Sequence, residues 1–376
     1  MNDLLTNPLF ILIVISFNIA VSIWLENNTP LKTLGAALLV ILITAVIANL
    51  GIIPSATAGS EVYSVIFSYI APISIFYLLL GVSLKHLKAA GLPMLTAFGL
   101  GTLGTVLGVL FAYMLLGHEL GDNAKVIAGM IAGTYIGGSI NFNAIAIEYD
   151  MMQQGPLYVS ITAVDNILTT LWMMTTIAIP WVMNRWLPTK PGVRIKEALY
   201  TDFDSSGLNI SSLGILIFIG LLTLLISDLL AEWLGIPSIL ILTTIALILA
   251  QIPYFNKLQE AKVLGLYMVY AFLAVIGAYC ELSAMAGIGQ LAITVLGFLT
   301  IVVLIHGAMI LLTGILFKTN WSIIAVASQA NIGGSSSALA LAKSLKRNDL
   351  LLPAVLVGSL GNGIGTYIGF LLIKVL

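Results

Sequence analysis

Two interrupted apolar segments constrain the fold of this chain more than any other feature. The sequence Ile-Gly-Gly-Ser occurs at 136–139 and again at 332–335, which is 196 residues later, each time inside an apolar run long enough to enter a bilayer. Glycine raises the entropic cost of a helix, and serine offers the backbone competing hydrogen bonds. We therefore predict a break in the helix at both places.

The composition indicates an all-α membrane protein with many spans. Hydrophobic residues make up 60% of the 376 residues, charged residues make up 8%, and the mean hydropathy is +1.09. A soluble domain carries roughly 25% charged residues. The net charge of −1 argues against a nucleic-acid partner, and the single cysteine, Cys280, excludes an intrachain disulfide. The N-terminus has no basic region and no cleavage motif, so the first apolar run is interpreted as a retained span.

Apolar runs of spanning length predict ten crossing helices and two broken segments. The longest polar link, from Arg185 to Asn209, lies near the middle of the chain and is predicted to join two halves. The ten predicted crossings are 8–25, 33–53, 62–84, 92–117, 156–184, 208–232, 237–253, 262–281, 288–317 and 350–374, and the broken segments are 126–147 and 321–342.

The two halves are related by a sequence repeat. At a constant offset of 196, Gly81 aligns with Gly277 and Asn166 aligns with Asn362. Apolar composition alone does not explain such aligned glycines and asparagines. We therefore predict one copy at 1–190 and a second at 205–376. In each copy the first three spans (8–84 and 208–281) would form a scaffold, and the remainder (92–184 and 288–374) a core.

The distribution of basic residues favours an inverted arrangement of the two copies. If all twelve runs cross, the basic residues divide nine to six, whichever way the chain is oriented. If the broken runs are re-entrant hairpins and both termini lie outside, thirteen basic residues face the cytoplasm, and Lys125 and Lys374 lie outside. Cytoplasmic loops are enriched in Lys and Arg. The sequence therefore predicts inverted repeats, with ten crossings and two hairpins.

The tips of the two hairpins are the predicted site for a solute. Irregular backbone at membrane depth must be covered by protein or face a wet cavity, and each tip has free amides and carbonyls. A paired break in two repeats indicates the binding site of a transporter. Close packing through small residues is the alternative interpretation of each tip taken alone. The predicted substrate-binding residues are Ser139, Asn141, Asn143, Asn331, Ser335, Ser336, Ser337 and Asn362.

Asp165 is the most informative single residue. It lies about ten residues into a predicted span, with Thr162 and Thr169 on its own helix face, and no Lys or Arg occurs in the interior of any predicted span. An ionised carboxylate at that depth costs at least a few kcal/mol. It must be protonated, hydrated or paired with a cation. We therefore predict a Na⁺ or H⁺ coupling site at Asp165, Thr162 and Asn166, with Gln329 from the second tip. The alternative is a neutral, hydrogen-bonded core Asp, and mid-span His306 is likewise either a core residue or a proton relay.

The residues named so far resemble those of the YjcL-like family of bacterial inner-membrane proteins of unknown function. The resemblance covers the whole chain, and it depends on Gly-Gly-Ser at 137–139 and 333–335, on Asp165-Asn166 and on Gly361-Asn362-Gly363. More distantly, the chain resembles the sodium:glutamate and 2-hydroxycarboxylate symporters, through Gly137-Gly138 and Gly333-Gly334. That resemblance implies opposed hairpins and an elevator motion of a core along a scaffold.

We therefore expect a secondary active transporter that couples Na⁺ or H⁺ to a small polar or anionic solute, such as an amino acid, a short peptide or an organic acid. A cation:proton antiporter and a non-transporting scaffold or receptor are the alternatives. An intramembrane enzyme would need a nucleophile–base pair or a set of metal ligands, and three scattered His and one Cys argue against it. No cofactor besides the coupling ion is expected. The expected partners are the solute, the lipid bilayer and a second copy in a homodimer, and the expected location is the bacterial inner membrane.

Overall fold

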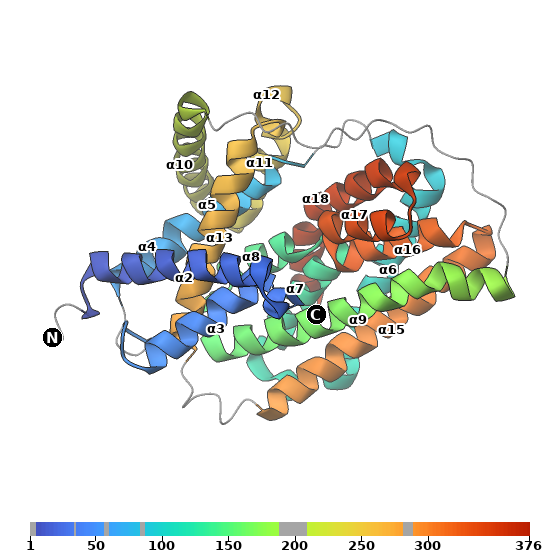
Figure 1. Cartoon of the computed structure of the whole chain (residues 1–376), viewed down its shortest axis with the longest axis horizontal. Helices are drawn as coiled ribbons and strands as arrows, with labels where there is room; N and C mark the ends of the chain where they lie inside the picture. Colours follow the sequence, from blue (N-terminus) through green and yellow to red (C-terminus); the bar gives the residue numbers. More distant parts are fainter. Residues whose placement is uncertain (1–4, 34, 56–59, 83–86, 188–208, 281–288) are drawn as a thin grey trace.

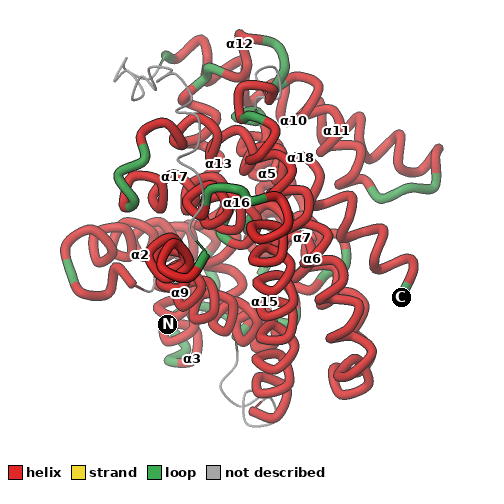
Figure 2. The backbone as a smooth tube through the Cα atoms, turned by 90° about the vertical axis from the view of Figure 1, so that its right-hand side faces the viewer, coloured by secondary structure: helices red, strands yellow, loops and turns green. Residues whose placement is uncertain are grey.

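The predicted apolar runs form helices. The computed structural model describes residues 5–33, 35–55, 60–82, 87–187, 209–280 and 289–376, and every regular element in these ranges is helical (Figure 2). The helix bounds lie within a few residues of the predicted runs. Much of the predicted link between the halves, including the predicted boundaries at 190 and 205, lies outside the described residues.

The helices in the ranges predicted as a scaffold pack on one another, and they are called the scaffold group below. Within it, α13 packs against α3 and α5, α2 packs on α3, and α10 packs beside α11 (Figure 1). The π-helical stretch η2 lies between α4 and α5, and the three pieces form one continuous helix. The scaffold helices are α2 (Pro8–Asn28), α3 (Gly35–Asn49), α4 (Glu61–Val65), η2 (Ile66–Ile70), α5 (Ala71–Leu79), α10 (Ile210–Leu234), α11 (Ser238–Leu249), α12 (Pro253–Asn256) and α13 (Gln259–Tyr279).

The remaining helices, called the core group below, are organised around the packing of α6 against α15. Glycines on α6 permit this close approach, because a Cβ atom at Gly104 would press on Met309 and one at Gly108 would press on Val302. The core helices are α6 (Leu92–Leu116), α7 (Ala124–Gly137), α8 (Ser139–Glu148), α9 (Gly155–Trp186), α15 (Gly289–Phe317), α16 (Trp321–Ile332), α17 (Gly334–Ser344) and α18 (Leu351–Val375).

The helices are suited to a membrane. Eight helices in the described ranges are long and apolar enough to cross a bilayer. Two further predicted spans form the shorter apolar helices α3 and α11, with 15 and 12 residues. Large apolar side chains cover outward faces, as on α10, where Phe218 is 63% and Leu229 is 59% exposed. Such surfaces are normal where lipid replaces water.

Candidate functional site

Both predicted helix breaks are present, and each depends on a glycine with positive φ. The helix α7 ends at Gly137, and Gly138 adopts φ +105° before α8 begins at Ser139. In the second copy, α16 ends at Ile332, and Gly334 adopts φ +72° at the start of α17. A side chain is strained in this region of backbone space, so glycine is required there. The Gly-Gly pair therefore fixes each turn.

Each broken segment is a hairpin whose two ends lie side by side. At the mouth of the first hairpin (α7–α8), Asn123 Nδ2 donates to Gln154 Oε1 over 2.8 Å. At the mouth of the second hairpin (α16–α17), Arg347 Nη1 donates to Asn320 Oδ1 over 3.1 Å and is held by a 2.7 Å ion pair with Asp349. A helix that continued across the bilayer would place these ends far apart.

The mouths of the two hairpins lie at opposite ends of α9. Gln154, at the first mouth, immediately precedes α9. At the other end of α9, the indole N–H of Trp321, the first residue of α16, donates to the carbonyl of Leu187 over 2.8 Å. Between these points, Thr176 donates to Gln329 over 3.2 Å. The two hairpins therefore point toward each other along α9.

The tips of the hairpins touch. A Cβ atom on Gly334 would lie 3.0 Å from the carbonyl oxygen of Gly137 and 3.5 Å from the Cα of Gly138. The middle of α18 closes the same junction, since a Cβ on Gly137 would overlap the backbone of Gly361, and one on Gly361 would overlap Ile136. Three backbone segments, from α7–α8, α16–α17 and α18, therefore meet at one point.

Asn141 binds the first hairpin to α18. It is fully buried, and its Oδ1 accepts hydrogen bonds from the backbone N–H and the hydroxyl of Thr366, at 3.0 and 2.8 Å. Its Nδ2 donates to the carbonyl of Gly361 over 3.4 Å. This predicted solute ligand therefore has its polar atoms engaged in holding the tip in place.

Asp165 lies on the inward face of α9. Together with Thr169, Trp172 and Thr176 it follows the helical spacing of one face, while Ile167, 57% exposed, lies on the opposite face. The hydroxyl of Thr169 donates to Asp165 Oδ1 over 3.3 Å, which confirms their predicted shared face. The hydroxyl of fully buried Tyr135, from α7, lies beside the same carboxyl group.

Asp165 as a residue is half-buried, and its carboxyl group points inward to Thr169 and Tyr135. The neighbouring predicted ligands are arranged differently. The hydroxyl of Thr162 donates back to the carbonyl of Tyr158 over 2.9 Å, and Asn166 is half-buried one position further round the helix. The oxygen atoms that could hold a cation with Asp165 are therefore the hydroxyls of Thr169 and Tyr135.

The other predicted tip residues divide into two groups. Gln329, Asn331 and Asn143 are buried: Asn331 is hydrogen-bonded to Thr102 on α6 over 3.0 Å, and Asn143 accepts from Tyr158 over 2.5 Å. The predicted residues that keep some exposure are Ser139, which is exposed, and Ser335 and Ser337, which are half-buried; Asn362 is 8% exposed with its Oδ1 near Gly138, and the side chain of Ser336 lies outside the described residues.

A buried polar network passes through His306. Its Nδ1 lies 3.0 Å from the carbonyl of Gly101, which can only accept, so Nδ1 carries the proton. Nε2 then accepts from the hydroxyl of Ser328 over 2.9 Å, and Ser328 accepts from the indole of Trp172 over 3.0 Å. A neutral imidazole satisfies every one of these bonds. The geometry therefore favours the core-residue interpretation of His306 over a proton relay.

The sequence did not single out Tyr135, Thr105, Trp172 or Ser328 as partners in this region. Their signal is weak, because aromatic and hydroxyl residues are common in apolar helices and pair across helices that are distant in sequence. The spacing of Asp165, Thr169, Trp172 and Thr176 at i, i+4, i+7 and i+11 is a signal that could have identified the inward face of α9.

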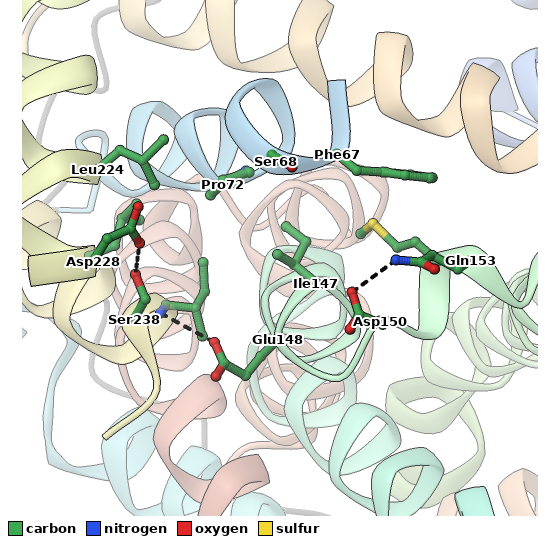
Figure 3. A pocket seen from close by; sticks show the side chains of 13 residues that line it. Phe67, Ser68, Pro72, Ile147, Glu148, Asp150, Gln153, Leu224, Asp228 and Ser238 are labelled. Carbon is green, nitrogen blue, oxygen red and sulfur yellow. Dashed lines mark hydrogen bonds between the residues drawn. The ribbon is translucent and has the colours of Figure 1, made fainter. Parts of the chain in front are cut away.

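A cavity of about 260 Å³ lies between core and scaffold at the mouth of the first hairpin (Figure 3). Three carboxylates line it, from Glu148 at the end of α8, Asp150, and Asp228 on α10. Glu148 accepts a 3.5 Å hydrogen bond from the backbone N–H of Ile239 at the start of α11, and Asp228 accepts from Ser238 over 2.6 Å. The cavity therefore presents negative charge beside the hairpin.

Comparison with known proteins agrees with this architecture. The family described as "Protein of unknown function (DUF819)" matches residues 12–376. The chain is also similar to the uncharacterized membrane protein YjcL of Bacillus subtilis (strain 168), with 29% identity over an alignment that covers 93% of this chain and 92% of the relative. Since the family match covers nearly the whole sequence, this chain is a member of the DUF819 family of membrane proteins.

Proposed function

We propose that this protein is a secondary active transporter, in which a small solute binds at the hairpin tips and Na⁺ or H⁺ binds at Asp165. The observation that carries the proposal is the contact of two helix breaks beside a carboxylate that faces inward. In transporters built from repeats, broken helices supply amides and carbonyls to solute and ion near the middle of the bilayer. The contact between Gly334 and Gly138, with Asp165 on the adjoining helix, matches that arrangement.

The position of the hairpin mouths supports inverted repeats. A helix of 32 residues, as α9 is, extends about 48 Å, which exceeds the roughly 30 Å thickness of the hydrocarbon core. If α9 crosses the membrane, the two mouths lie on opposite faces. Together with the basic residues, this supports a topology in which both termini lie outside a bacterial inner membrane and the short helices α3 and α11 complete ten crossings.

The division into two helix groups supports an elevator motion. Two hydrogen bonds between core and scaffold both involve residues of α11. The amide of Ile239 donates to Glu148, and the hydroxyls of Thr244 and Tyr367 are hydrogen-bonded at 2.8 Å. Within the core, by contrast, buried polar bonds join α6, α9, α15 and α16. The core would therefore move as one body against a static scaffold, and the scaffold would form the homodimer contact.

The exposed tip residues define the solute site. Ser139, Ser335 and Ser337 keep some accessibility at the start of α8 and α17, where helix amides are unpaired. Asn362 faces the same junction. These groups offer neutral donors and acceptors. They suit a small polar or anionic solute, in the class of amino acids, short peptides and organic acids, while Asn141, Asn143 and Asn331 shape the tips.

One observation favours a cation:proton antiporter as the second candidate. The tips are in direct contact, whereas Asp165 lies away from that contact, beside Thr169 on α9. An exchanger of cations alone needs the carboxylate and no space between the tips. A metabolite-stabilisation screen on the purified protein separates the two candidates, because only a symporter gains thermal stability from an organic solute.

The proposal is tested by thermal unfolding of the purified protein in NaCl and in choline chloride, across pH. A ligand that binds only the folded state raises stability by mass action. We expect a stabilisation by Na⁺ or by protons that disappears in Asp165→Asn. It should persist in the matched variant Asp228→Asn, which removes a carboxylate from the cavity instead. If neither ion nor pH changes the melting of the wild-type protein, the transporter proposal is contradicted and a non-transporting scaffold is favoured.

A further inference from the structure

The hydroxyl group of Tyr135 is buried without a hydrogen-bond partner in the described residues. The side chain is 0% exposed, and its oxygen makes no hydrogen bond among the described residues. It lies close to the carboxyl of Asp165 and the hydroxyl of Thr169, but its orientation gives neither contact the geometry of a hydrogen bond. A buried polar atom with no partner is unfavourable unless something absent from the protein itself supplies one.

The position of Tyr135 is fixed by its surroundings. It lies in the last turn of α7, and its backbone carbonyl accepts a 3.0 Å hydrogen bond from Thr105, which in turn contacts His306. The C-terminal end of a helix carries partial negative charge, and this end stops inside the protein at Gly138. The phenolic oxygen is therefore held in a region that favours a cation.

Asp165 has the complementary need. In the described part of the core, no lysine or arginine pairs with it, and Thr169 supplies only a neutral hydroxyl. Hard monovalent and divalent cations prefer carboxylate, hydroxyl and carbonyl oxygens. One Na⁺ would neutralise the carboxylate and give the Tyr135 oxygen a partner at the same time. Proton coupling at Asp165 predicts no affinity for Na⁺ that the loss of the Tyr135 hydroxyl could change, so the two kinds of coupling differ in this readout.

We propose that Tyr135 is a ligand of the coupling ion, and that its hydroxyl oxygen, the Asp165 carboxylate and the Thr169 hydroxyl together hold one Na⁺. This inference rests on the proposed function and narrows it from Na⁺ or H⁺ to Na⁺. It also replaces Thr162 and Asn166, which the sequence favoured, with residues from α7 and from the next turn of α9.

The test is Tyr135→Phe, with sodium affinity read from the rise in melting temperature as NaCl replaces choline chloride at constant ionic strength. Loss of one oxygen ligand should weaken the apparent affinity by about tenfold, which corresponds to roughly one hydrogen-bond-sized contribution. In choline chloride alone, the variant should melt at or above the wild-type temperature, because it removes an unpartnered hydroxyl. A merely structural role would not produce opposite changes in these two readouts.

Tyr77→Phe is the matched control. Tyr77 is also buried, at 1% exposure, but its hydroxyl donates to the carbonyl of Leu216 over 2.9 Å within the scaffold. This variant should melt at a lower temperature and keep wild-type sodium affinity. Thr169→Val, which removes the third oxygen, should weaken sodium affinity in the same direction as Tyr135→Phe.

The outcomes separate the two proposals. If Na⁺ stabilises the wild-type protein and Tyr135→Phe keeps the wild-type sodium affinity, the Tyr135 site is wrong and the proposed transport function stands. If only pH, and not Na⁺, acts through Asp165, the sodium site is overturned in favour of proton coupling. If neither acts, both proposals fail.

Discussion

The helices α9 and α18 align with each other in the predicted sequence repeat, yet they are covered very differently. α9 begins at Gly155 and α18 at Leu351, which are 196 residues apart, and Asp165 corresponds to Gly361. In the most apolar window of α18, 67% of the residues are buried, against 11% in α9. Gly361 packs directly on the first hairpin, whereas the carboxyl of Asp165 lies beside the hydroxyls of Thr169 and Tyr135.

Under the proposed function, this difference explains why the repeat would have one ion site instead of two. Glycine at 361 allows the backbone of α18 to touch the first tip, and Asn141 then locks that contact by bonding to Gly361 and Thr366. At the aligned place in α9, Asp165 carries the carboxyl group to which the proposed function assigns the coupling ion. The proposal therefore gives α18 a structural role and α9 the ion site.

The largest expected effect comes from exchanging the two residues. Gly361→Asp should destabilise the protein by more than about 3 kcal/mol, because it forces a side chain into the backbone of the first hairpin and buries an unpaired charge. Asp165→Gly should leave the fold intact and abolish the response to the coupling ion. Melting temperatures and the yield of monodisperse protein in detergent measure both effects.

Wild-type stability of the Gly361→Asp variant would contradict the difference between α9 and α18. A Gly361→Asp protein that melts like the wild type would mean that α18 does not press on the first tip as described. Gly363→Ala is the matched control on the same helix, because a Cβ there would meet only the side chain of Leu247, at 3.6 Å.

An intermediate effect is expected at the first hairpin. Asn141→Ala removes the bonds to Gly361 and Thr366 and leaves buried backbone groups unpaired, which should cost about 2–3 kcal/mol. The corresponding residue of the second copy is Ser337, which is half-buried, and Ser337→Ala should cost less than about 1 kcal/mol. Thermal unfolding of the two variants measures both losses of stability. Equal losses would argue against the difference between the two hairpins.

The smallest effect concerns the hairpin mouths, which also differ. Burial raises the pKa of Glu148 above its ordinary value of 4.5, the N–H of Ile239 opposes this, and the charges of Asp150 and Asp228 raise it further. The folded protein thus holds this proton more tightly than the unfolded chain, so stability from this group falls as pH rises above 4.5 through the raised pKa. Glu148→Gln should remove this dependence of stability on pH.

The pH slope is measured as the melting temperature of the wild-type protein relative to Glu148→Gln. A relative melting temperature that rises with pH in this window would contradict the stated direction of the pKa. Glu232→Gln, at an exposed position on α10, is the matched control. Its melting temperature should depend on pH as that of the wild-type protein does.

The sequence was sufficient to predict the helices and their two breaks. Apolar runs set the helix bounds, and Gly-Gly-Ser marked the breaks because the required φ values at Gly138 and Gly334 are accessible only to glycine without strain. The contact between the two tips also followed from the repeat, since equivalent segments of paired repeats tend to meet. These are properties of local composition and of symmetry.

The side-chain roles within the site were less predictable. Asn141 and Asn331 have the composition of solute ligands, but they bond to α18 and α6, whose positions depend on tertiary packing. Tyr135 reaches Asp165 because α7 stops beside α9, and no spacing in the sequence encodes that proximity. Polar residues in apolar helices therefore identify the region, and the packing of the helices decides which of them remain available.

The central claim is that two hairpins enter from opposite faces and meet at the tips, and sided labelling tests it most directly. Single cysteines at the exposed positions Lys125 and Lys346, one at each mouth, are introduced with Cys280→Ala and reacted with a membrane-impermeant maleimide. We expect Lys125→Cys to react in intact cells and Lys346→Cys to react only after permeabilisation. Labelling of both positions from the same side would contradict the opposed hairpins and the account built on them.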